Sequence, residues 1–182
     1  MRGLCRIAVI CLLVALTPWS RLDASADLRS APHALAQRFQ ALEDALNNRA
    51  QPLQKVRVLH DQISPSAIFQ VSVDNPTLSP AQNATRFELD KAGYINSFLL
   101  GGRHVADYHA SIQVVSIDPD VRSGQMISTI LLEESGAVMD ARYRGQRGRD
   151  FISHTVCRSV HGRNLQILSS SCDTAVSYNN PV

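Results

Sequence analysis

The spacing of apolar residues predicts a long amphipathic helix that begins soon after residue 30. Apolar side chains recur at intervals of four, three and four residues, which places them on one helix face. They are Leu35, Phe39, Leu42 and Leu46. Ser30 is a suitable N-cap and Pro32 fits the first turn, where a missing N–H costs nothing. Asn47 and Asn48 indicate the end of this helix.

A second, shorter helix is predicted over residues 53–63, and it ends at Ser64 and Pro65. Residues 67–73 alternate between apolar and polar and predict a strand. Residues 74–84 are poor in apolar side chains and rich in turn formers, so we expect a loop there.

A third helix is predicted over residues 91–100. Asp90 is its expected N-cap, and Gly101 and Gly102 are expected to end it because glycine accepts the left-handed cap conformation. The apolar side chains of this segment fall on one face. They are Tyr94, Ile95, Phe98 and Leu99.

In the second half of the chain, apolar and polar residues alternate, which is typical of strands. Residues 109–118 form the first long predicted strand, and residues 118–124 turn the chain. One face of this strand is apolar and consists of Tyr108, Ala110, Ile112 and Val114. Residues 125–134 are apolar on both faces, which is typical of a central strand.

A tight turn is expected at Glu134-Ser135-Gly136, and residues 137–144 pair back against the preceding strand. Residues 150–160 and 164–172 then form a closing hairpin. Helices followed by a run of antiparallel strands predict an α+β fold, with residues 27–182 as a single domain.

The order of these elements resembles the NTF2-like (SnoaL-like) fold family over roughly residues 30–175. The stretches that carry the resemblance are residues 56–73, Asp90-Lys-Ala-Gly-Tyr-Ile-Asn-Ser-Phe-Leu-Leu-Gly-Gly102, and Gly162-Arg-Asn-Leu-Gln-Ile-Leu168. The resemblance implies a cone of about three N-terminal helices packed on a bent antiparallel sheet of four to six strands. The family includes ketosteroid isomerases, polyketide cyclases and dehydratases, but also non-enzymatic binding domains, so the fold does not choose a function.

Enzymes of this family place an Asp, His or Tyr inside the cone as general acid or base. The candidates in this sequence are Tyr94, His109, Asp140 and His154. In the isomerases such an Asp lies where the second helix passes into the first strand. Here that junction is Ser64-Pro-Ser-Ala67 and holds no carboxylate, which argues against isomerase-like catalysis. The residues expected to contact a ligand are Tyr94, Phe98, His109, Arg142 and Tyr143.

Two charged clusters have alternative interpretations. Asp107 and His109 share a strand face if the strand begins that early, and could form a proton-abstracting pair or a solvated strand start. The combination of His104, His109 and a carboxylate matches no established spacing of metal ligands, so we expect no metal. Four arginines at 142, 144, 147 and 149 could receive an anionic ligand, an acidic partner or a lipid headgroup. Alternatively they keep an exposed strand soluble and protect its edge.

Two functions therefore compete. The first is a non-enzymatic domain that binds a small apolar ligand or a protein partner in or on its sheet. The apolar face that begins at Tyr108 could pack on the helices or form a homodimer. The second is a small lyase or isomerase that needs no cofactor and uses His109 or Asp140 as its base.

The charge balance of the chain argues against one class of partner. Arg2, Arg6, Arg21 and Asp23 precede residue 27, so of 18 basic and 16 acidic residues, 15 of each remain in the rest of the chain. A neutral body argues against general nucleic-acid binding.

The amino terminus predicts export. Arginines at 2 and 6 precede an apolar run, and Ala24-Ser25-Ala26 supplies a signal-peptidase site before Asp27. The 14 residues between Arg6 and Arg21 would span only roughly 21 Å of a ~30 Å hydrocarbon core, so no stable membrane span is expected. Residues 1–26 are thus a predicted cleavable signal of a periplasmic or secreted protein.

Only Cys157 and Cys172 would remain after cleavage, and an exported protein usually oxidises such a pair. The hairpin register complicates this prediction. If Val160 faces Leu165, Cys172 lies four residues past the partner of Cys157, roughly 13 Å away, which is too far for a disulfide. A bulge, a longer turn or a curled strand end would close the gap.

Overall fold

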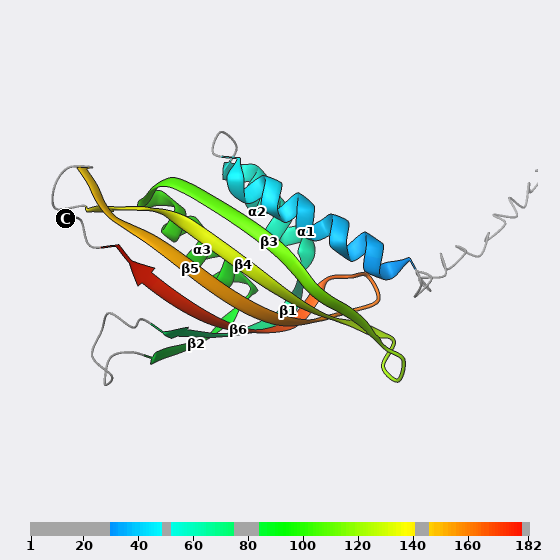
Figure 1. The fold of residues 1–182 in the computed structure, drawn as a ribbon. Coiled ribbons are helices and arrows are strands. Elements are labelled where there is room, and N and C mark those ends of the chain that lie inside the picture. Colours follow the sequence, from blue (N-terminus) through cyan, green and yellow to red (C-terminus); the bar gives the residue numbers. More distant parts are fainter. Residues whose placement is uncertain (1–29, 49–51, 75–83, 141–145, 180–182) are drawn as a thin grey trace, which may run out of the picture.

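The computed structural model describes residues 30–48, 52–74, 84–140 and 146–179. The predicted signal peptide, together with Arg142, Tyr143 and Arg144, lies outside the described residues. Three helices and six strands follow one another along the chain (Figure 1). They are α1 (Ala31–Asn47), α2 (Pro52–Gln62), β1 (Ile63–Asp74), β2 (Ala84–Asp90), α3 (Lys91–Arg103), β3 (Val105–Asp120), β4 (Gln125–Asp140), β5 (Gln146–His161) and β6 (Ile167–Tyr178). The predicted α+β class is confirmed.

The six strands form one bent sheet in the order β2-β1-β6-β5-β4-β3 (Figure 1). Every neighbouring pair is antiparallel except β1 and β6, which run parallel. The sheet is therefore mixed and not purely antiparallel as predicted. The paired residues of β1 and β6 are about 100 positions apart in the chain, so local pattern did not reveal this pairing.

The helices cover the concave face of the sheet, and their apolar stripes form the core. Leu35, Phe39 and Leu46 of α1 are buried, as the helical spacing predicted. They pack against the inward face of β3 and β4, including Ala110 and Ile130. The apolar face of β3 thus lies under α1. Among the described residues, no helix combines the length and hydrophobicity needed to cross a membrane.

The start of α3 is fixed to the end of α2. Asp90 accepts a hydrogen bond from the backbone N–H of Gly93 at 2.7 Å, which confirms the predicted N-cap. The ammonium group of Lys91 donates to the carbonyl oxygens of His60 and Ile63, each at 2.7 Å. The His60 carbonyl lies in the last turn of α2, where carbonyl groups lack partners within the helix. These bonds set where α3 begins and so where its apolar face lies.

Two predicted boundaries near α3 were wrong. The helix continues through Gly101 and Gly102 to Arg103. Residues 84–90, of which 84 was assigned to a loop, form β2, which pairs along β1. Its exposed edge position needs little apolar content, so alternation alone did not reveal it.

The turn predicted at Glu134-Ser135-Gly136 is also wrong, because β4 runs through it without a break. The glycine has another purpose. A Cβ atom at position 136 would lie 2.6 Å from Cγ1 of Val105 and 2.9 Å from the carbonyl oxygen of Ala106. Gly136 therefore allows β3 to approach β4 closely. In the sequence alone, a glycine of this kind is hard to distinguish from one that marks a turn.

The hairpin between β5 and β6 resolves the cysteine register. His161 pairs with Ile167 and Val160 pairs with Ser169, so the turn is longer than predicted and the register shifts between the two pairs. Cys157 consequently faces Cys172 directly. Their Cα atoms are 4.1 Å apart and their sulfur atoms are bonded at 2.07 Å. The predicted disulfide is present, through the longer turn that it required.

Candidate functional site

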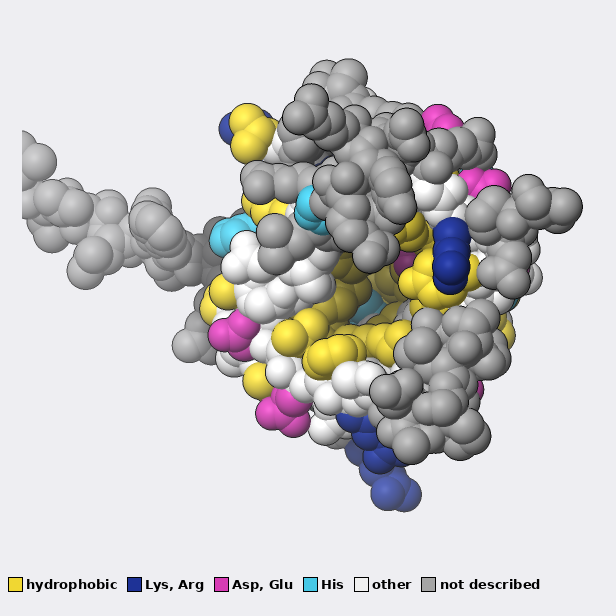
Figure 2. Space-filling model, turned by 90° about the vertical axis from the view of Figure 1, so that its left-hand side faces the viewer, with side chains coloured by type: hydrophobic (Ala, Val, Ile, Leu, Met, Phe, Trp, Pro, Cys, Tyr) yellow, Lys and Arg dark blue, Asp and Glu magenta, His cyan; other side chains and the backbone are white. Residues whose placement is uncertain are grey.

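A cavity of about 450 Å³ lies between α3 and the sheet. Figure 2, which views the end of the molecule where β6 finishes, shows a hollow walled largely by hydrophobic side chains. Five of the six strands and α3 contribute to the wall. The lining residues are Val71, Val73, Phe87, Leu89, Tyr94, Ser97, Phe98, Leu132, Glu134, Thr155, Cys157, Cys172 and Thr174. Pockets of this size and character bind small apolar molecules.

The α3 wall of the cavity is aromatic. The Tyr94 ring stacks on Phe69 with centroids 3.9 Å apart and lies 5.3 Å from the Phe98 ring. Burial, reinforced by the nearby charge of Glu134, raises the pKa of Tyr94 well above its usual range. The phenol therefore stays protonated and can donate a hydrogen bond to a bound molecule.

Glu134 is the only ionisable carboxylate that lines the cavity among the described residues. One of its carboxylate oxygens accepts a hydrogen bond from the Tyr108 hydroxyl at 2.6 Å, and the other accepts from Ser153 at 3.2 Å. Burial and the adjacent Glu134 charge raise the pKa of Tyr108 far above its usual range, so Tyr108 remains a donor. A carboxylate has about four acceptor sites, so Glu134 keeps acceptor capacity for a ligand proton.

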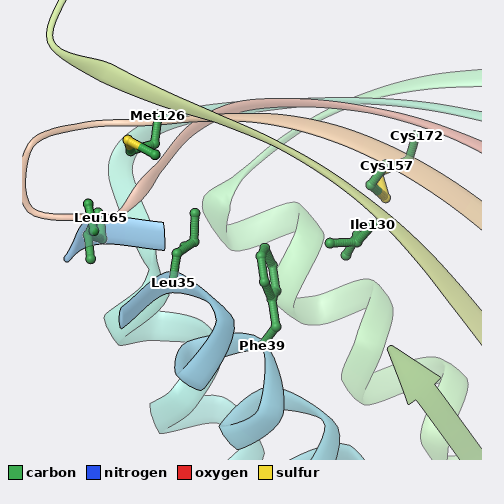
Figure 3. Close-up of a cluster of buried hydrophobic side chains, with 8 residues drawn as sticks. Leu35, Phe39, Met126, Ile130, Cys157, Leu165 and Cys172 are labelled. Atoms are coloured by element: carbon green, nitrogen blue, oxygen red, sulfur yellow. A yellow bond between two sulfur atoms is a disulfide. The ribbon is translucent and has the colours of Figure 1, made fainter. Parts of the chain in front are cut away.

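The inner end of the cavity is closed by the disulfide. Cys157 and Cys172 line the cavity and also belong to the cluster formed by Phe39, Met126 and Ile130 (Figure 3). The disulfide therefore separates the hollow from the solid core behind it.

The structure brings some of the predicted site residues together and separates others. Tyr94 and Phe98 line the cavity, and their contact with a ligand stays a prediction. His109 is exposed, because alternation along β3 points it away from the face that carries Ala110. His154 is also exposed on the outer face, where its Nδ1 lies 3.3 Å from Glu133. Neither histidine reaches the cavity.

The remaining predicted residues are placed as follows. Asp140 is the last residue of β4, and its side chain is outside the described part of the chain, as are Arg142 and Tyr143. Asp107 lies within a register shift between Ala106 and His109 and has a positive φ of 49°. Asp107 and His109 are both exposed, and neither lines the cavity. No group of three or more metal-ligating side chains occurs among the described residues.

Glu134 was missed by sequence reasoning. The alternation of Ile130, Leu132 and Glu134 along one strand face was visible, and all three point inward. The turn wrongly predicted at Gly136 put Glu134 at the end of a strand, so its inward orientation was not recognised.

Solved structures with the same architecture were found at low sequence identity. A type 2 hexachlorocyclohexane dehydrochlorinase is 6% identical with a TM-score of 0.56, covering 85% of this chain and 93% of its own. A putative scytalone dehydratase from Novosphingobium aromaticivorans is 9% identical with a TM-score of 0.50, covering 86% and 89%. A conserved protein from Planctomyces limnophilus is 12% identical with a TM-score of 0.52, covering 83% and 99%.

This protein has the NTF2-like fold. The predicted resemblance is confirmed at the level of architecture, and these identities carry no more than the fold. The sequence matches no family model and no curated protein. Because one fold hosts many functions, the function depends on the side chains that line the NTF2-like cone.

Proposed function

We propose that the protein binds a small, largely apolar molecule in its NTF2-like cone and that Glu134 transfers a proton on it, as a cofactor-independent lyase or isomerase. The observation that carries this proposal is the Glu134 carboxylate, which lines an apolar cavity of about 450 Å³ and is held at 2.6 Å by Tyr108. A carboxylate fixed in such surroundings is a general base that needs no metal.

The proposed chemistry combines a base, Glu134, with a hydrogen-bond donor, Tyr94. Glu134 accepts a proton from a carbon of the bound molecule, and Tyr108 and Ser153 hold the carboxylate in place through both oxygens. Tyr94 lines the same cavity and stays protonated, so its hydroxyl can donate to an oxygen on which negative charge develops. Loss of a leaving group completes an elimination, and return of the proton to another carbon completes an isomerisation.

The names of two structural neighbours, a dehydrochlorinase and a putative dehydratase, denote eliminations. They support the reaction class by analogy of fold.

The test uses nitrobenzisoxazole, a small aromatic compound whose ring opens when a base removes one carbon-bound proton. We expect the protein to accelerate this reaction and Glu134→Gln to reduce kcat/KM by about 100-fold or more, the range for loss of a general base. Glu133→Gln is a matched control, because Glu133 directly precedes Glu134 on β4 and lies on the outer face. It should keep wild-type activity.

A second candidate function is binding without catalysis. It is favoured by the absence of a histidine–carboxylate pair from the described cavity wall. Fluorescence of phenylnaphthylamine, a neutral apolar dye, measures binding independently of turnover. If Glu134→Gln and wild type bind the dye and open nitrobenzisoxazole at equal rates, Glu134 is not a base and the protein is a binding domain.

A further inference from the structure

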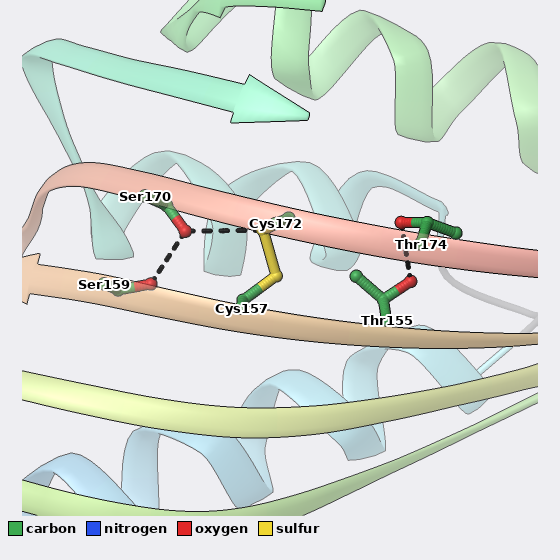
Figure 4. Close-up of a disulfide and its surroundings, with 6 residues drawn as sticks. All are labelled: Thr155, Cys157, Ser159, Ser170, Cys172 and Thr174. Carbon is green, nitrogen blue, oxygen red and sulfur yellow. Dashed lines mark hydrogen bonds between the residues drawn. A yellow bond between two sulfur atoms is a disulfide. The ribbon is translucent and has the colours of Figure 1, made fainter. Parts of the chain in front are cut away.

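Two pairs of hydroxyl side chains flank the disulfide between β5 and β6 (Figure 4). On one side, the Ser159 and Ser170 oxygens are 2.8 Å apart. On the other side, the Thr155 and Thr174 oxygens are 2.9 Å apart. All four side chains point to the concave face, because alternate residues of a strand share a face.

The serine pair is buried and both of its hydrogens are used. Ser170 lies 3.4 Å from the sulfur of Cys172. A disulfide sulfur has no hydrogen, so Ser170 is the donor to it, and Ser159 must then donate to Ser170. Both serines are less than a tenth exposed. This pair belongs to the core, and neither serine has a hydroxyl hydrogen left to donate to a ligand.

The threonine pair differs in its position and in its hydrogen bonding, although Thr155 is as buried as Ser170. Thr155 and Thr174 line the cavity. Their mutual hydrogen bond uses one of the two hydroxyl hydrogens, and the structure gives neither hydroxyl another partner among the described residues. One O–H donor is therefore left beside a largely apolar cavity, where an unmade hydrogen bond is costly.

The threonine pair lies deeper in the cone than Glu134. Glu134 pairs with Ser153 across β4 and β5, and the next inward-facing position toward the disulfide is Thr155. Diagonal neighbours of this kind are about 7 Å apart in an antiparallel sheet. A bound molecule can therefore contact Glu134 and the threonine pair at the same time.

We propose that the Thr155–Thr174 pair donates a hydrogen bond to an oxygen acceptor at the inner end of the bound molecule. This inference rests on the proposed function that the cavity binds a small apolar molecule. It defines the ligand class as an uncharged ring compound whose carbonyl or ether oxygen lies on the disulfide side of the carbon that faces Glu134. An anionic ligand is disfavoured because Glu134 is the one carboxyl group, and no Lys or Arg is present, among the described residues that line the cavity.

The experiment measures competition of two matched probes with phenylnaphthylamine. Acetylnaphthalene carries a carbonyl oxygen, and isopropenylnaphthalene replaces it with a CH₂ group of similar shape. We expect wild type to prefer the ketone by about tenfold, the effect of one well-made hydrogen bond. In the Thr155→Val/Thr174→Val variant the ratio of the two affinities should fall to about one, since this variant removes both hydroxyls.

Three further variants make the result specific. Thr155→Ser/Thr174→Ser keeps both hydroxyls and should restore the preference even if the valine variant is poorly folded. Ser159→Ala/Ser170→Ala removes two hydroxyls beyond the disulfide and should keep the wild-type ratio. Tyr94→Phe removes the other hydroxyl donor on the wall and shows whether that donor, and not the threonine pair, binds the ketone oxygen.

The proposal is overturned if a folded valine variant keeps the ketone preference, if Tyr94→Phe alone abolishes it, or if wild type shows none. In the last case the proposed function survives when nitrobenzisoxazole turnover still depends on Glu134. If phenylnaphthylamine does not bind at all, the proposed function fails as well.

Discussion

The imidazole of His161 lies in the core between α1 and the sheet and is only 1% exposed. Its Nε2 lies 2.8 Å from the hydroxyl of Ser128, and Phe39 packs edge-on against the ring at 6.1 Å. Burial, only partly offset by the neighbouring Leu165 backbone and reinforced by the positive charge of Arg38, lowers the pKa of His161 to about 4. The folded protein therefore holds this histidine neutral.

A pH dependence of stability follows. The unfolded chain takes up the proton near the ordinary pKa of 6.5, whereas the folded chain resists it down to about 4. Stability is therefore fully present above pH 6.5 and is lost as the pH falls toward 4. We expect His161 to account for a loss of roughly 2 kcal/mol in the free energy of unfolding between about pH 7 and about pH 5.

Urea unfolding at the two pH values measures this loss. His161→Gln should remove the histidine-dependent part of it, whereas His154→Gln, at an exposed position, should behave as wild type. An unchanged pH dependence in His161→Gln would show that His161 is not the sensitive group.

At the scale of elements, α1 covers the free edge of β3. The Asn47 side chain donates to the carbonyl oxygen of Ala110 and accepts from its N–H, each at 2.8 Å. One turn earlier on α1, Glu43 accepts from the N–H of Ile112 at 2.5 Å. These side chains take the place of a further strand. An exposed strand edge is otherwise a template for pairing with other chains.

Asn47→Ala tests this edge cover. The change leaves one N–H and one C=O of Ala110 without partners at a part-buried position. We expect it to lower the free energy of unfolding by about 1–3 kcal/mol in urea and to increase self-association in size-exclusion chromatography. Gln40→Ala, on the exposed part of the same helix, is the control and should change neither quantity measurably. Equal stability of the two variants would mean that solvent satisfies the β3 edge.

The elements differ in how far their sequence predicted them. The helix α1 and the alternation on β3 were predictable, because each depends on residues a few positions apart. The strand β2 and the continuity of β4 were not. Edge strands carry a weak pattern, and Gly136 is explained only by its contact with Val105 on another strand.

At the scale of the whole molecule, the disulfide ties the last strand into the sheet. Cys157 and Cys172 are separated by 15 residues and close the β5–β6 hairpin at the inner end of the cavity. Reduction, or replacement of both cysteines by serine, should lower the free energy of unfolding by about 3 kcal/mol, the value for a closed loop of this length.

Urea unfolding with and without a reductant measures this difference, and the double serine variant should be insensitive to the reductant. Alkylation of the native, oxidised protein followed by mass spectrometry provides the direct check. Two freely alkylated thiols would contradict the disulfide.

Local patterns in the chain were enough to predict the fold class, the main helices, the inward face of β3, and the helix face that carries Tyr94 and Phe98. Each follows from a periodicity within one segment. Which side chains meet in the cone depends on contacts between distant segments. Glu134 reaches Tyr108 from 26 residues away, and the disulfide depends on a longer turn. A slip of one residue would turn every side chain of a strand to the opposite face, so these contacts depend on register.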